Sequence, residues 1–214
     1  MAQPGRTMPS KTPSTLEELD AIVGIKSAAP MKIGGATGRP EPGKLTSTSV
    51  KAKTPKEPNP IEDDIPEIEA LIDRFDNAAA RYGIPVEILA GIASRESRVG
   101  KHLNAAGYDE EKKAYGIMQI DERYHKRKGK KPDSQEHIDQ AASILAKNKQ
   151  AIDEDKRFAK WTEEQRMRAA VAAYNFGLGN VKSWKGLDVG TTGNDYSKDV
   201  MERANMYKSL VGNK

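Results

Sequence analysis

Residues 85–100 read PVEILAGIASRESRVG, an almost wholly apolar helical run that ends in charges. Pro85 suits the first turn of a helix, and the residues after it leave little polar face, so we expect a helix buried in the middle of the domain. Its last turn carries Glu96. Because burial of an ionised carboxylate is unfavourable, Glu96 is expected to stay protonated and is a candidate general acid. The alternative is an ion pair between Glu96 and Arg95 or Arg98.

Helical periodicity continues on both sides of this run. Before it, apolar residues recur at intervals of three and four from Pro66 until Gly83 supplies a stop, which predicts one amphipathic helix. After it, Thr162 and Gln165 form a capping box ahead of an alanine-rich helix. The later helices are expected to start near Ser134, Thr162 and Asp195.

Residues 100–131 are broken by glycines and charges. Within them, residues 114–121 are the only candidate strand or tight buried segment, and we find no series of alternating strands that builds a substantial sheet. The fold class is therefore expected to be mainly α, with at most a minimal sheet.

The N-terminal part has a different composition. Residues 1–60 are rich in Pro, Gly, Ser, Thr and Lys without sustained periodicity, which predicts a disordered arm followed by one domain over residues 61–214. The exception is residues 15–23, where apolar side chains at helical spacing predict one short amphipathic helix.

Composition excludes several classes of function. The 214 residues include no Cys, which removes disulfides, thiolate metal sites and a Cys nucleophile. The net charge of +4 is a modest basic excess, and the basic run 126–131 has no interleaved aromatic residue, so no nucleic-acid partner is expected. No apolar stretch is long enough for a membrane span, and the start of the chain lacks the apolar core of a secretory signal.

Three segments together resemble the goose-type lysozymes in order and spacing: residues 94–100 (SRESRVG), 115–121 (YGIMQID) and 173–177 (AYNFG). The similarity covers about residues 66–210. The Glu, the Gly-x-Met-Gln segment and the Ala-Tyr-Asn-x-Gly segment are shared with the wider lytic transglycosylase superfamily, whereas Asp121 and the later Gly190-Thr191-Thr192 are more particular to the goose type. The resemblance implies a lysozyme-like helical domain.

The resemblance also implies catalytic roles. The family's catalytic Glu falls on Glu96, and one of its acidic residues that handle water falls on Asp121. The other acidic residue falls in a loop where Asp109 and Glu110 are both candidates, and Asp109 is the one that we predict. Glycoside cleavage by inversion needs this pair of roles, a protonated acid and a more distant ionised carboxylate. The alternative for Asp121 is a helix cap or a salt bridge with Arg123.

Four further positions resemble residues of the family's sugar groove: Gln119, His125, Tyr174 and Asn175. Without the resemblance, Tyr174 would be assigned to the core and Asn175 to a helix cap. His125 and His137 both have family counterparts, yet neither has the spacing of a zinc motif. No metal and no cofactor are expected.

The resemblance implies a muramidase that cleaves the β-1,4 bond between N-acetylmuramic acid and N-acetylglucosamine of peptidoglycan with inversion. The alternatives are a lytic transglycosylase, which forms 1,6-anhydro products with the same Glu, and a non-catalytic peptidoglycan-binding protein. The expected partner is the bacterial cell wall, with a lysozyme inhibitor protein as a candidate second partner. We expect a monomer that acts outside the cell or in the periplasm.

Overall fold

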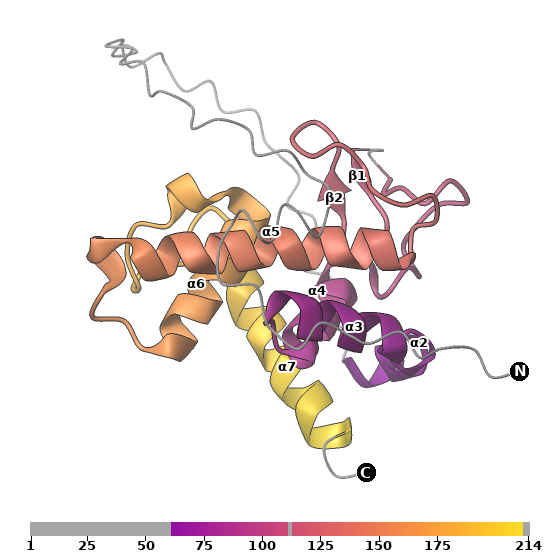
Figure 1. Cartoon of the computed structure of the whole chain (residues 1–214), viewed down its shortest axis with the longest axis horizontal. Coiled ribbons are helices and arrows are strands. Elements are labelled where there is room, and N and C mark those ends of the chain that lie inside the picture. The colour runs from indigo at the N-terminus through magenta and orange to yellow at the C-terminus, as the bar shows by residue number, and fades with distance from the viewer. Residues whose placement is uncertain (1–60, 111–112, 212–214) are drawn as a thin grey trace, which may run out of the picture.

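The computed structural model describes residues 61–110 and 113–211 and shows a mainly helical domain with one very small sheet (Figure 1). This confirms the predicted fold class. The arm at residues 1–60 and the helix predicted at residues 15–23 lie outside the described residues. The elements are η1 (Ile61–Asp64), α2 (Ile65–Ala70), α3 (Ile72–Tyr82), α4 (Val86–Ser97), β1 (Ala114–Tyr115), β2 (Ile120–Asp121), α5 (Gln135–Glu154), η2 (Lys156–Phe158), α6 (Glu163–Phe176), η3 (Leu178–Asn180), η4 (Thr192–Asn194) and α7 (Tyr196–Val211).

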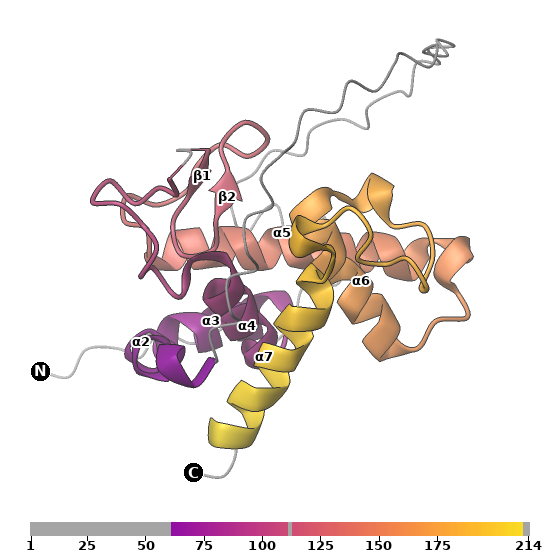
Figure 2. The ribbon, with the colours of Figure 1, turned by 180° about the vertical axis from the view of Figure 1, so that it is seen from behind.

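Helix α4 forms the centre of the domain, as predicted. Residues 88–94 are buried, and α4 packs most extensively against α7 and also against α3. Helix α5 runs across the molecule and packs against α3 and α6, with the β1–β2 hairpin near one end and the segment after α6 near the other (Figures 1 and 2). None of the helices in the described ranges has the length and apolar character that a membrane crossing requires.

The helix predicted from Pro66 to Gly83 is instead two helices, so the expectation of one continuous helix was wrong. Leu71 has φ −113° and ψ 8°, and its N–H bonds to the Ile68 carbonyl, three residues back, at 3.0 Å. Ile68 before the break and Phe75 after it are both fully buried. Packing on both sides of the break therefore overrides the local periodicity.

Residues 114–121, expected to be a strand or a tight buried segment, form a tight and largely buried hairpin of two very short strands. β1 and β2 pair antiparallel, with Tyr115 opposite Ile120. Gly116, in the turn, has φ +75°, and a β-carbon there would lie 2.3 Å from His137 Nε2. That same Nε2 accepts a hydrogen bond from the Met118 N–H at 3.2 Å, so the buried His137 holds the turn on α5.

The capping signals read from the sequence are present. Thr162 and Gln165 form the reciprocal capping box, with hydrogen bonds of 2.9 Å and 3.2 Å. Ser134 caps α5 by accepting from the His137 N–H. These caps fix the starts of α5 and α6, the two helices that carry one side of the site described below.

Helices α4 and α7 approach each other closely at Gly91. A β-carbon on Gly91 would lie 2.7 Å from the Val200 carbonyl oxygen and 3.2 Å from the Ala204 nitrogen, both backbone atoms. Only a glycine permits this distance between the helices.

We expect Gly91→Ala to destabilise the domain by about 1–3 kcal/mol, because the added methyl must push α7 away from α4. Urea unfolding followed by circular dichroism measures this change. Gly179→Ala is the matched control, since a β-carbon at Gly179 meets nothing within 4 Å. Equal stability of the two variants would contradict the importance of the α4–α7 contact.

Candidate active site

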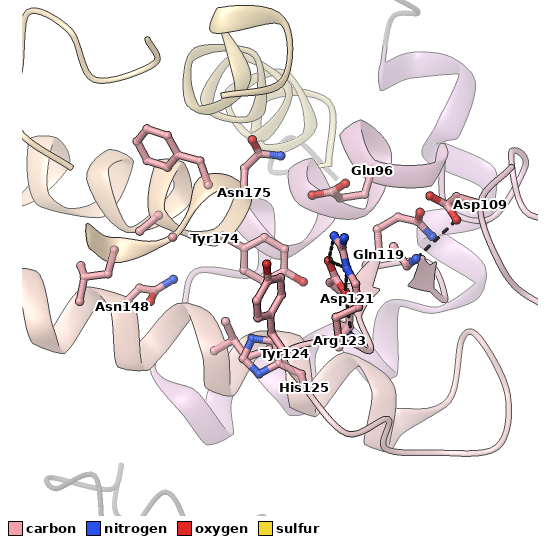
Figure 3. A pocket seen from close by; sticks show the side chains of 17 residues that line it. Glu96, Asp109, Gln119, Asp121, Arg123, Tyr124, His125, Asn148, Tyr174 and Asn175 are labelled. Atoms are coloured by element: carbon pink, nitrogen blue, oxygen red, sulfur yellow. Dashed lines mark hydrogen bonds and ion pairs between the residues drawn. The ribbon is translucent and has the colours of Figure 1, made fainter. Parts of the chain in front are cut away.

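A groove of about 740 Å³ lies between the hairpin and helices α4, α5 and α6 (Figure 3). The structure brings all of the predicted site residues to its wall, although they come from four separate parts of the chain. These residues are Glu96, Asp109, Gln119, Asp121, His125, Tyr174 and Asn175. Figure 3 shows the Glu96 carboxyl pointing into the groove, with Asp109 toward one end of the labelled side chains and Asn148 toward the other.

Glu96 occupies the last turn of α4, and its carboxyl is closely surrounded by protein although the side chain is only partly buried. Burial raises its pKa from the ordinary 4.5 to about 7, against the smaller opposing effects of a hydrogen bond from Tyr196 and the charge of Arg95. The Tyr196 hydroxyl donates to Glu96 Oε1 at 2.5 Å. At pH 7 about half of the Glu96 carboxyls therefore hold a proton that they can give away, and a larger share does at lower pH.

The two arginines beside Glu96 bind other carboxylates. Arg95 donates to Asp199 at 3.0 Å and to Asp195 at 2.9 Å. Arg98 donates to the fully buried Asp64 at 3.1 Å. The ion pairs expected under the alternative for Glu96 are thus made elsewhere, and the Glu96 carboxyl faces the groove.

Asp121 ends β2 and also lines the groove. Arg123 binds both of its carboxylate oxygens, with Nε at 2.9 Å and 3.0 Å and Nη2 at 2.5 Å. The hydrogen bonds from Arg123 lower the pKa of Asp121 below its ordinary value. The salt bridge considered as an alternative does form, and it keeps an ionised carboxylate in the same groove as a protonated one.

The acidic loop residues differ in their placement. Asp109 lines the groove and accepts hydrogen bonds from the Lys113 N–H at 2.9 Å and the Ala114 N–H at 3.4 Å. Glu110 is exposed and does not line the groove. Of the two candidates, Asp109 is the one beside the groove.

Tyr174 and Asn175, at the end of α6, make specific contacts across the groove. The Tyr174 hydroxyl donates to the Met118 carbonyl at 2.8 Å, which ties α6 to the hairpin turn. Burial, followed by the charge of Glu96, raises the pKa of Tyr174 well above its ordinary value, so the phenol stays neutral. Asn175 accepts from the Thr192 N–H at 2.9 Å and donates to the Thr192 hydroxyl at 3.2 Å, so it fastens the segment before α7.

Gln119 and His125 line the groove on the hairpin side. Gln119 has φ +47°, and its amide donates to the Gly116 carbonyl at 2.8 Å, which fixes the side chain beside the turn. Burial lowers the pKa of His125, against the opposite effect of Asp121. His137 is different, because it is fully buried and does not line the groove. Its role in the structure is to support the turn.

Sequence reasoning did not assign Tyr196 to the site, although it contacts Glu96 directly. It is the first residue of α7, where the Asp188 carboxylate accepts from the Ser197 N–H at 2.7 Å. A partner 100 residues away in sequence has no local signal, because only the packing of α7 on α4 creates the contact. Tyr124 and Asn148 are further groove residues that were not predicted.

Within residues 61–110 and 113–211, no three His, Asp or Glu side chains gather as metal ligands would. The reactive groups that the groove presents are two carboxyls, Glu96 with a raised pKa and Asp121 with a lowered pKa. Such a pair, in a helical domain with a small hairpin, is typical of glycosidases of the lysozyme-like class.

Comparison with known proteins gives the family. A family model described as Lysozyme g matches residues 43–210. Lysozyme g of Casuarius casuarius is 38% identical over 141 residues, which cover 64% of this chain and 74% of that protein. Lysozyme g of Struthio camelus is 42% identical over 141 residues, which cover 64% of this chain and 67% of that protein. A glycine, glutamate and proline-rich protein of Lottia gigantea is 37% identical over 156 residues, which cover 67% of this chain and 35% of that protein.

The chain therefore belongs to the lysozyme g family and is a glycoside hydrolase. The family consists of peptidoglycan-lytic muramidases, and the resemblance read from the sequence is confirmed.

We expect Glu96→Gln to stabilise the fold at pH 8 but not at pH 4. The folded carboxyl has a pKa of about 7 and the unfolded one about 4.5, so the folded state binds more protons between these values. Stability therefore falls as the pH rises through this window. Removal of the ionisable group should raise the free energy of unfolding at pH 8 by up to about 3 kcal/mol. Denaturant unfolding at both pH values tests this, and a loss of stability at pH 8 would contradict it.

Proposed function

We propose that this protein hydrolyses the β-1,4 bond between N-acetylmuramic acid and N-acetylglucosamine of peptidoglycan with inversion. Glu96 is the general acid, and Asp121 assists the attacking water. The observation that carries the proposal is the pair of carboxyl groups in one groove, with the pKa of Glu96 raised to about 7 and that of Asp121 lowered.

In the proposed reaction, Glu96 gives its proton to the glycosidic oxygen as the bond from that oxygen to C1 breaks. A water molecule attacks C1 from the opposite face, and Asp121 takes the proton that this water loses. Glu96 ends as a carboxylate, which the Tyr196 hydroxyl stabilises by the hydrogen bond it already donates. Asp109, at the wall of the same groove, is the second candidate for orienting the water.

The four predicted sugar-binding residues support this proposal in different ways. Gln119 and His125 present polar groups on the hairpin side of the groove. Tyr174 and Asn175 line the groove while they hold its parts together through Met118 and Thr192, as described above.

A lytic transglycosylase remains the second candidate, and the Arg123–Asp121 salt bridge favours it, because an Asp bound to Arg123 on both oxygens can serve structure alone. In that reaction the sugar's own 6-hydroxyl attacks C1 in place of water. A non-catalytic binding protein does not need the raised pKa of Glu96.

We expect purified peptidoglycan treated with the native enzyme to yield ordinary reducing ends, with the α-anomer formed first. Asp121→Asn should slow this release by about 100-fold or more, because it removes the base that activates water. Mass spectrometry and NMR of the products measure both effects. Glu96→Gln is the inactive reference and should release nothing above background. A majority of 1,6-anhydro ends, with little effect of Asp121→Asn, would establish the transglycosylase.

We expect Tyr196→Phe to move the alkaline limb of the pH profile to higher pH. The limb reports ionisation of Glu96, and the hydrogen bond from Tyr196 lowers the pKa of that carboxyl. Without the hydroxyl the pKa rises, so Glu96 keeps its proton to higher pH. The measurement is kcat/KM against pH between about 4 and 9.

Tyr207→Phe is the matched control for this experiment. It lies on the same helix, and its buried hydroxyl has no hydrogen-bond partner among the described residues. Its alkaline limb should coincide with that of the native enzyme. A limb that moves to lower pH in Tyr196→Phe would contradict the assignment of Glu96 as the titrating acid.

A further inference from the structure

Tyr124 is the most exposed large hydrophobic side chain among the described residues, with 77% of its surface accessible. Single exposed apolar residues are common, so exposure alone carries no argument. Tyr124 is different because it lines the groove that contains Glu96 and Asp121. Figure 3 shows its ring among the labelled groove residues, next to His125.

The position of Tyr124 is fixed by the turn that follows β2. The N–H groups of Tyr124 and His125 both donate to the Asp121 carbonyl, at 3.1 Å and 3.0 Å. The Arg123 guanidinium, held by the Asp121 carboxylate, lies 5.5 Å from the centre of the Tyr124 ring. The turn therefore fixes the backbone of Tyr124 at the groove, and the ring lies beside Arg123 with most of its surface open to solvent, where a ligand can reach it.

The wall of the groove combines polar and apolar groups. The carboxyl groups of Glu96 and Asp121 line it, and so do apolar side chains that include Ile144, Phe176 and Leu178. Asn148, on α5, adds an amide toward the end opposite Asp109 (Figure 3). A groove with an aromatic surface, apolar side chains and separate polar groups matches a ligand that is itself apolar on one face and polar at its edges.

We propose that Tyr124 is a substrate-binding residue whose ring packs on the C–H face of an N-acetylhexosamine unit of the glycan strand. This assignment rests on the proposed function, since it concerns the same groove. Tyr124 contributes to binding of the glycan and leaves proton transfer to Glu96.

The test uses chitohexaose, the β-1,4-linked hexamer of N-acetylglucosamine, and the inactive Glu96→Gln protein, so that binding is measured without cleavage. Titration calorimetry should show that Tyr124→Ala in this protein weakens binding by about tenfold. Tyr124→Phe is the matched control, because it keeps the ring and removes only the hydroxyl. Its affinity should stay close to that of Tyr124 itself.

In the active enzyme, Tyr124→Ala should raise KM for bacterial cell walls while kcat changes little. Equal chitohexaose affinity of the Ala and Tyr forms would overturn the assignment, as would a fall in kcat at unchanged KM. Weak binding by Tyr124→Phe equal to that of Tyr124→Ala would assign the effect to the hydroxyl and also overturn it. Failure of the proposed function is distinguishable, because the native enzyme would then release no reducing ends from peptidoglycan.

Discussion

Helices α4 and α7 pass so close at Gly91 that the Val200 carbonyl leaves no room for a β-carbon, and the site depends on this contact. The register that places Gly91 against Val200 also places Glu96, five residues further along α4, against Tyr196 at the start of α7. A wider separation would withdraw the Tyr196 hydroxyl and admit water around the Glu96 carboxyl. Both changes alter its pKa, so helix packing and acid strength are set together.

Helices α4 and α7 also share a network of ion pairs and hydrogen bonds among charged and polar groups other than Glu96. Arg203 on α7 donates to Ser94 at 2.8 Å and to Asp199 at 2.7 Å, and Asp199 also accepts from Arg95. Ser94 in turn donates to the buried Asp64 at 2.7 Å. With these charges already paired, Glu96 remains the group whose ionisation is disfavoured, which is what a general acid near neutral pH requires.

Features that depend on interactions between residues close in sequence could be predicted from the sequence. Features that depend on contacts between residues far apart in sequence could not. The α4 helix, the capping box at Thr162 and the helical fold class arise from local patterns, and they agree with the structure. The break at Leu71 and the hairpin within residues 114–121 were not predicted, because the buried Ile68 and the close fit of Gly116 to His137 belong to tertiary packing. The resemblance located residues that meet at one groove, whereas the contact of Tyr196 with Glu96 requires the folded α4–α7 pair.

Arg123 links two features of the groove that would otherwise be independent. One guanidinium binds the Asp121 carboxylate and lies 5.5 Å from the Tyr124 ring, so a sugar packed on the ring as proposed would approach the ion pair. Exclusion of water strengthens the attraction within the pair, whereas the loss of hydration of the carboxylate disfavours its ionised form. The ionised state of Asp121 in the proposed complex therefore depends on Arg123, because only the attraction to this guanidinium offsets the cost of desolvation.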